Sequence, residues 1–558
     1  MEHALLHALL LTGLLVAFGG PVAMLWLYAP SARLLGNDAG RDALLDALTR
    51  SVTRWTVYGA LAAAFATFVD FFVSVAELHG ETVFGGADLS EVVRFVTQTT
   101  VGLLSLACLA FLLLTALATW LPWKRRWWLV AALAFAAIVA NGEVSHAAAQ
   151  PGNNTLPVIA QIAHIVAAAL WMGVLLHIFL ARGVLLHDAT GTRVAFVARV
   201  VRRFSPLALA TTFLLGITGL VAAWRYLHSL ETIFQSPYGL TLIVKLIMLS
   251  PAIFAGFINF RHIGPALAGL AKGTVVSPGN PGTKGASPEI SAVFSRFSRM
   301  LELEATAGLL VIAVAGILGS VSPPGDDGSQ RLLPEQAHVF LLPRLPTTDV
   351  SGWDLPDDPH GVPLAEKRYD EFTHNWSGIM VCLMGAAWLA ISIGGRAGYW
   401  ASRLLPILFI FFGLFIDLAG NPELWILRRY GLLEALANPI LLEHQIGGGM
   451  LFVLAWLTWR DRKTPEALRP LGYPLAVIMI VGSLLLLGHA HSLTRLPDDF
   501  TIMVNVQHAF FGAFVLFAGT TRLLMLRGLV PARVARIAWP SFVICLGLFM
   551  AFFYREVI

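Results

Sequence analysis

The feature that most constrains the fold of this chain is a series of long apolar runs. Fourteen segments of about 20 residues consist mainly of apolar side chains, and a helix of that length crosses the ~30 Å hydrocarbon core of a bilayer. Only 13% of the 558 residues are charged, against about 25% in soluble domains. We therefore predict an all-α polytopic integral membrane protein with about 14 transmembrane helices in the lipid bilayer. The runs cover residues 6–28, 55–76, 97–120, 127–148, 156–182, 204–226, 238–262, 301–320, 374–394, 404–420, 437–459, 470–491, 501–524 and 537–554.

The loops between these runs alternate between basic and acidic. The basic set includes Lys124, Arg125 and Arg126, and the acidic set includes Glu81 and Asp88. Lys and Arg concentrate in cytoplasmic loops, so the alternation predicts that both termini lie outside. The same segregation accounts for the net charge of +4 without a nucleic-acid partner.

A segment rich in Pro, Gly and Asp separates two groups of runs, and we predict a domain boundary there. It covers residues 321–373 and is expected to form an acidic outer loop. Residues 1–320 then form an eight-span unit, and residues 374–558 form a six-span unit rich in histidine. The sequence has no phosphate-binding loop, nucleotide fingerprint or nucleophile triad. An ATP-driven pump, a nucleotide partner and an enzymatic function are therefore disfavoured.

The histidines are distributed unevenly across the predicted membrane. Thirteen of the 16 lie outside or in the outer leaflet, and only His177, His187 and His262 lie toward the inside. An imidazole in hydrocarbon is costly unless it is paired or acts as a ligand. The distribution therefore predicts a metal or haem site near the outer face. The thirteen are His3, His7, His79, His146, His164, His228, His338, His360, His374, His444, His489, His491 and His508.

In the eight-span unit, the candidate metal ligands lie at the outer ends of three spans. His164 lies about two turns into its span, and His146 ends the preceding span three residues after Glu143. His3 and His7 are four residues apart and therefore share one helical face.

In the six-span unit, two histidines lie well inside spans. His444 and His508 are each about seven residues into a span entered from the same side, so they reach the same depth. His489 and His491 end another span, where only one is expected to face a shared site, and His374 opens a further span. Nearby side chains that could assist ligation are Glu443, Met380 and Met384.

Several of these residues have a simpler interpretation that stays open. The histidines at span ends can be interfacial imidazoles, and the two methionines can be core packing. Asp70 and Lys245 are both buried at outer-leaflet depth. They can form a paired charge, relay protons or position a ligand.

Ordered motifs between about residues 140 and 265 resemble the bacterial copper resistance D family (CopD/PcoD). They are Ser145-His146-Ala, His164-Ile-Val-Ala-Ala-Ala-Leu-Trp171-Met-Gly, Arg203-Phe-Ser-Pro-Leu-Ala, Gly216-Ile-Thr-Gly and Tyr238-Gly-Leu-Thr-Leu-Ile-Val-Lys245. The last third of the chain resembles, less specifically, the additional C-terminal multi-span unit of long family members. Its matching pieces are His374-Asn-Trp-Ser-Gly, Asn421-Pro-Glu-Leu-Trp, Glu443-His444, Gly488-His-Ala-His-Ser and Gln507-His-Ala-Phe-Phe-Gly.

The resemblance implies a multi-pass protein of the bacterial cytoplasmic (inner) membrane that handles copper. It makes His146 and His164 the candidate copper ligands, with Trp171 and Lys245 as structural companions. We see no cupredoxin-like or Met-rich copper-capture domain, so we expect a separate periplasmic carrier protein to deliver copper.

Two functions fit this pattern. In the first, outer histidines capture copper and the spans import it, contributing to copper homeostasis or resistance. The inner half offers only His177, Met172 and His262 as imidazole or thioether groups, so the inward path is sparse. In the alternative, His444 and His508 ligate haem b in a membrane cytochrome, with possible copper redox chemistry. A membrane scaffold with interfacial histidines is a third hypothesis.

Overall fold

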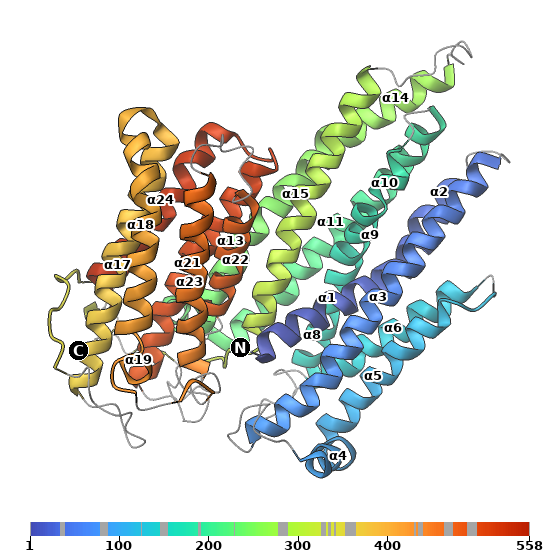
Figure 1. The fold of residues 1–558 in the computed structure, drawn as a ribbon. Coiled ribbons are helices and arrows are strands. Elements are labelled where there is room, and N and C mark those ends of the chain that lie inside the picture. The colour runs from blue at the N-terminus through green and yellow to red at the C-terminus, as the bar shows by residue number, and fades with distance from the viewer. Residues whose placement is uncertain are drawn as a thin grey trace. The chain divides into compact units, whose positions relative to one another are not determined.

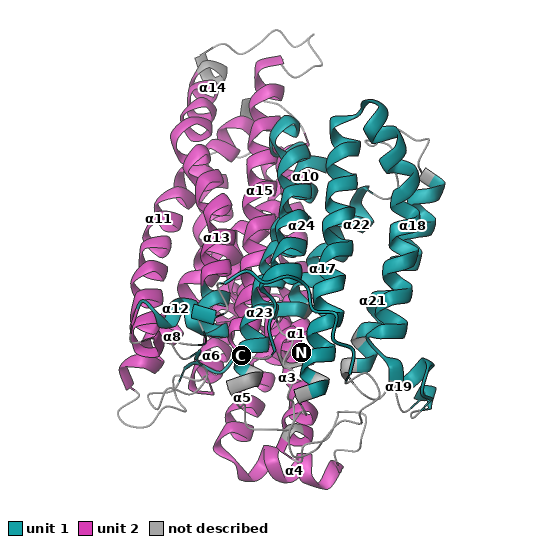
Figure 2. Ribbon diagram, turned by 90° about the vertical axis from the view of Figure 1, so that its left-hand side faces the viewer, with its two compact units in different colours: residues 1, 230–242, 321–558 teal, residues 2–229, 243–320 magenta. Residues whose placement is uncertain are grey.

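The structure is a computed structural model of the chain, and its described residues form helices and loops without a strand (Figure 1). The described residues are 2–33, 39–78, 88–123, 125–144, 155–187, 191–227, 229–276, 288–324, 331–332, 336, 338–339, 342–351, 364–428, 431–433, 439–461, 472–487 and 499–556. Contacts divide the chain into two compact units (Figure 2). The N-terminal unit holds residues 2–229 and 243–320, and the C-terminal unit holds residues 1, 230–242 and 321–558.

The N-terminal unit is built around its first helix. That helix, α1 (Glu2–Val22), packs against α3 (Ala39–Leu78), α6 (Arg126–Glu143) and α15 (Pro288–Leu318). The remaining elements are η1 (Ala23–Tyr28), α2 (Ala29–Ala32), α4 (Leu89–Gln98), α5 (Thr100–Ala118), α8 (Thr155–Ala168), η3 (Ala169–Gly173), α9 (Val174–Leu180), α10 (Arg182–Leu185), α11 (Gly191–Leu227), α13 (Pro237–Ile258), η4 (Asn259–Ile263) and α14 (Gly264–Val276). The first six residues of α13, 237–242, belong to the C-terminal unit.

Small residues bring α1 close to η3. A Cβ atom added at Gly19 would lie 2.3 Å from the carbonyl carbon of Gly173, and one added at Gly173 would lie 2.1 Å from the Leu15 carbonyl oxygen. Helices in lipid gain little from apolar burial and associate through close packing, which small residues permit. These glycines therefore fix the position of η3, which lies in the same span as His164.

The C-terminal unit is a bundle of helices. Helix α17 (Leu364–Ile393) packs against α24 (Ala532–Phe553) and α18 (Gly395–Ala419), α18 against α21 (Pro439–Asp461), and α23 (Asp499–Leu526) against α22 (Gly472–Leu487) and α24. The short helices are α12 (Thr232–Gln235) and α19 (Pro422–Trp425). Gly394 and Gly395 turn the chain between α17 and α18 at φ of 85° and 68°, which glycine adopts without strain.

The structure confirms the predicted fold class. Each of the fourteen predicted runs coincides with a helix, and eleven helices among the described residues are long and apolar enough to cross a membrane. The other three are α6, α21 and the shorter apolar helix α22. Large apolar side chains such as Phe213 and Trp224 are exposed on the helix surface, as expected for contact with lipid. The count of fourteen spans, the outside location of both termini and the predicted domain boundary remain predictions.

Candidate functional site

Several predicted ligands lie outside the described part of the chain. Residues His146, His489 and His491 are not described, and neither are the side chains of His3 and Glu443. Their assignment as ligands or assisting groups stays a prediction. The described candidates fall into one group in each unit.

In the N-terminal unit, His164 is held by a hydroxyl from the neighbouring helix. Its Nδ1 lies 2.8 Å from Oγ1 of Thr218 on α11. The Thr218 hydroxyl donates its single proton to the Leu214 carbonyl oxygen at 2.8 Å, so it accepts from Nδ1–H of the imidazole. The neutral form of His164 therefore carries its proton on Nδ1, which leaves on Nε2 the lone pair that a metal requires.

Lys245 is the charged neighbour of this imidazole. It lies on α13 and interacts electrostatically with His164. Asp70 is half-buried on α3, and its pairing with Lys245 stays a prediction. We call His164, Thr218 and Lys245 the His164 site.

An imidazole fixed by a hydrogen bond on one ring nitrogen is the usual arrangement of a metal-binding histidine. The described residues contain no group of three or more His, Cys, Asp or Glu side chains that could hold a metal ion. A copper ion at His164 would therefore take further ligands from elsewhere, and His146 is the predicted one. The other candidates of this unit lie apart: His7 packs against Gly319 at the end of α15, and Glu143 is exposed at the end of α6.

Sequence reasoning missed a buried carboxylate in the same unit. Glu304 on α15 is 2% exposed and accepts hydrogen bonds from Trp171 Nε1 at 3.4 Å and from Asn259 Nδ2 at 3.1 Å. Trp171, predicted only as a structural companion, thus has a specific polar role. Glu304 stands four residues into the predicted span 301–320, and this carboxylate in an apolar run was the available signal.

In the C-terminal unit, His374 and His508 come together. Their ring centroids are 5.5 Å apart with an interplanar angle of 87°, and His374 stacks on Tyr554 at 4.1 Å. Nδ1 of His374 lies 2.8 Å from the Asp370 carbonyl oxygen, and Nδ1 of His508 lies 2.9 Å from that of Val504. Each imidazole therefore donates through Nδ1 and carries its lone pair on Nε2. We call His374, His508, Phe511 and Tyr554 the His374 cluster.

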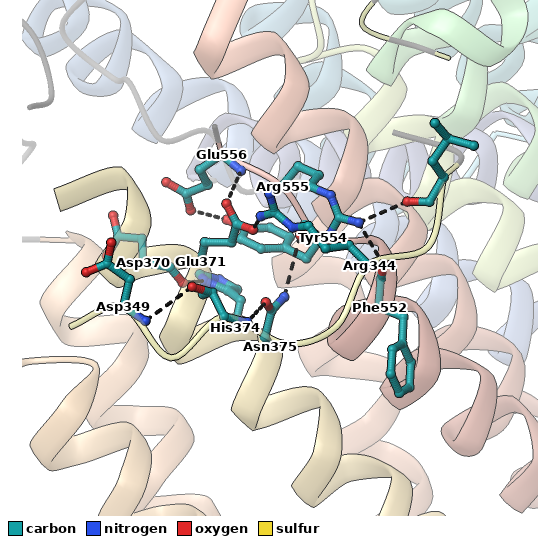
Figure 3. A network of polar contacts seen from close by, with 12 residues as sticks. Arg344, Asp349, Asp370, Glu371, His374, Asn375, Phe552, Tyr554, Arg555 and Glu556 are labelled. Atoms are coloured by element: carbon teal, nitrogen blue, oxygen red, sulfur yellow. Dashed lines mark hydrogen bonds and ion pairs between the residues drawn. The ribbon is translucent and has the colours of Figure 1, made fainter. Parts of the chain in front are cut away.

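A polar network surrounds Tyr554 and ties the end of the chain to α17 (Figure 3). The Tyr554 hydroxyl donates to Glu556, and Glu371, which is 1% exposed, forms an ion pair with Arg344. Burial raises the pKa of Tyr554 well above its usual range, and the Glu556 carboxylate reinforces that shift. Burial also lowers the pKa of Arg555 to about 10. The network therefore holds the His374 cluster in place while keeping the phenol protonated.

The other described candidates of the C-terminal unit lie elsewhere. His444 on α21 has Nδ1 3.1 Å from Asn421 Oδ1, beside the end of α18, whereas His508 packs against His374. Met384 is a buried member of the hydrophobic core, and Met380 packs against that core. The two thioethers thus lie where the packing interpretation places them.

Comparison with protein families identifies two segments of the chain. Residues 3–156 match the family model of the copper resistance protein D-like N-terminal domain, and residues 198–318 match that of copper resistance protein D. The first segment contains His146; the second contains Thr218, Lys245, Asn259 and Glu304, while His164 lies between the two. No curated protein and no solved structure matches the chain. The two ordered matches, together with the helical membrane fold, show that the chain belongs to the copper resistance D family.

Proposed function

We propose that this protein imports copper ions across the bacterial cytoplasmic membrane and that His164 is a copper ligand in the outer half of the path. Family membership supports a role in copper resistance or transport at a membrane. The observation that carries the proposal is the Nδ1–Thr218 hydrogen bond, which fixes the imidazole inside a predicted span with Nε2 as the donor atom. Imidazole nitrogen is a good ligand for copper.

Lys245 gives the site the modest affinity that transport requires. A transported ion must bind strongly enough to enter and weakly enough to leave. A cation at His164 would meet the Lys245 side chain, with which the imidazole already interacts electrostatically. Repulsion from this side chain therefore weakens binding and favours release of the ion.

Delivery from outside is the second part of the proposal. The predicted outer loops are acidic and attract cations, and a periplasmic copper carrier would supply the ion there. The predicted excess of histidines on that side is consistent with copper entering at the outer face.

The haem alternative has less support in the described residues. Two axial imidazoles must lie on opposite sides of a flat macrocycle. His374 and His508 contact each other directly, and Tyr554 and Phe511 pack on the same rings. In the described residues, His444 of the pair expected to ligate haem lies against Asn421.

Uptake of radioactive copper into proteoliposomes of known orientation tests the proposal. We expect saturable uptake from the periplasmic side and at least a tenfold loss in the His164→Ala variant. His187→Ala is the matched control, because His187 is exposed beyond α10 and should leave uptake unchanged. Uptake at the wild-type rate in His164→Ala would exclude His164 as the ligand, and no uptake by the wild type in either orientation would exclude transport.

A further inference from the structure

A buried carboxylate lies on the predicted inward route from the His164 site. Trp171 follows His164 by seven residues in the same span, which corresponds to about 10 Å along a helix. Trp171 donates a hydrogen bond to Glu304. In the predicted orientation this span runs inward, so Glu304 lies about two turns deeper than the His164 site.

Two irregular helix turns converge on this carboxylate. Trp171 lies in the π-helix η3 and Asn259 in the π-helix η4, and both side chains donate to Glu304. Single π-helical turns are rare and occur frequently at functional sites. Here they supply two donors from separate helices to one acceptor, so the carboxylate is the common point of the arrangement.

Glu304 has no cationic partner within ion-pair distance among the described residues. Several other described titratable side chains lie on this helix and on the elements that pack against it. They are His7 on α1, His177 on α9, Arg261 and His262 on η4, Lys272 on α14, and Glu289, Arg296, Arg299 and Glu302 on α15. His177 bonds to the Val16 carbonyl oxygen instead, and Arg261, His262 and Lys272 are exposed. A buried carboxylate without a cation is neutral only when it binds a proton.

The neighbouring amide can accommodate both protonation states. In the ionised state, Glu304 Oε2 accepts from Asn259 Nδ2 at 3.1 Å. The other end of that amide, Oδ1, is buried without a hydrogen-bond partner in the described part of the chain. Rotation of the amide would place Oδ1 where it accepts the proton of a neutral Glu304, so the amide satisfies the site with or without the proton.

We propose that Glu304 is a proton-binding site in the inner half of the membrane and that a copper ion moving inward from the His164 site displaces this proton. The O–H bond of the carboxyl group breaks, its electron pair remains on the carboxylate, and the proton passes to water. The resulting negative charge stabilises the passing cation where few imidazole or thioether groups are available. The coupling to copper rests on the proposed function, whereas the proton site itself does not.

Infrared difference spectroscopy of the purified protein tests the proton site without copper. The carbonyl stretching band of a protonated carboxyl group should titrate with pH in the wild type and disappear in Glu304→Gln. Glu302→Gln is the matched control, because Glu302 is two residues away on the same helix, whereas Trp171 and Asn259 bond to Glu304. Trp171→Phe removes a hydrogen-bond donor to the ionised Glu304 carboxylate. The titration midpoint of the Glu304 band should therefore rise by about one pH unit, a tenfold change in proton affinity. An unchanged band in Glu304→Gln overturns the proton site.

Copper uptake in proteoliposomes then tests the coupling. Wild-type and Glu302→Gln protein should show uptake that depends on the pH gradient, Glu304→Asp should retain part of that dependence, and Glu304→Gln should lose it. Uptake by Glu304→Gln with the wild-type pH dependence overturns the coupling. If the wild type binds the proton but transports no copper, the proposed function fails while the proton site stands, so the two failures are distinguishable.

Discussion

Replacing Thr218 by valine should weaken copper binding without disturbing the fold. Valine has nearly the same shape as threonine, so the packing of α11 against α8 is retained while the acceptor for His164 Nδ1–H is removed. The imidazole then loses the contact that fixes both its orientation and its tautomer. Copper must then select one ring orientation among several.

The size of this effect follows from the kind of contact that is lost. Removal of a hydrogen-bond partner behind a metal-binding histidine typically lowers metal affinity by about 10- to 100-fold. At 1.4 kcal/mol per tenfold change, this corresponds to about 1.4–2.8 kcal/mol of binding free energy. The 2.8 Å distance between Nδ1 and Oγ1 is that of a well-formed hydrogen bond, so we expect an effect within this range.

The matched control lies two turns earlier on the same helix. Thr211 is buried like Thr218, and its hydroxyl makes the same bonds to the carbonyl oxygens three and four residues before it. In the described part of the chain it bonds to no histidine. Copper affinity is measured by competition with a coloured chelator, and thermal unfolding checks the fold. We expect Thr211→Val to bind copper like the wild type. Equal affinities for the two valine variants would refute the role of the Thr218 bond.

Three further substitutions test other parts of the account. Lys245→Met should raise the copper affinity of the His164 site roughly tenfold and slow release, because a repelling charge is removed; unchanged affinity in the chelator competition would contradict this. Gly173→Ala should lower the free energy of unfolding by about 1–3 kcal/mol, because its Cβ would lie 2.1 Å from the Leu15 carbonyl oxygen; an unchanged Tm in detergent would show that the helices relax. Arg344→Met should destabilise the C-terminal unit by about 1–3 kcal/mol, because Glu371 is left buried and charged; limited proteolysis against temperature measures this loss.

Much of the fold could be predicted because the bilayer restricts the possible structures. A backbone in hydrocarbon must satisfy its own hydrogen bonds, so an apolar run of sufficient length becomes a helix. The run predicted at 156–182 is thus observed as the continuous span Thr155–Leu180. The number of residues between the start of this span and His164 gives the depth of the imidazole in the membrane. This depth makes His164 a candidate ligand.

The partners of these residues could not be predicted from depth. The depth of a residue in the membrane gives neither the rotation of its helix nor the neighbours of that helix. The sequence pairs His444 with His508 as haem ligands only because the two reach the same depth. The structure places His508 beside His374 and Tyr554, a contact that depth does not indicate. Tyr554 lies just beyond α24 and carries no metal-ligand pattern, so nothing in the sequence indicated that it would stack on an imidazole.

The cluster around Glu304 was hidden for a different reason. Its two donors come from π-helical turns, which an average of hydropathy over a span does not reveal. Trp171 and Asn259 are far apart in sequence and meet only when η3 and η4 approach α15. The carboxylate alone was visible in the sequence, and its place near the end of a predicted span made it resemble an ordinary interfacial charge.

Pulsed electron paramagnetic resonance of the copper(II)-loaded protein shows whether His164 coordinates copper. With isotopically labelled histidine, the account predicts nitrogen coupling from an imidazole in the wild type and in His187→Ala. In His164→Ala the nitrogen coupling should be weakened or lost. This variant should also bind at least one copper ion fewer per chain than the wild type. A spectrum and copper content of His164→Ala identical to those of the wild type would contradict the account.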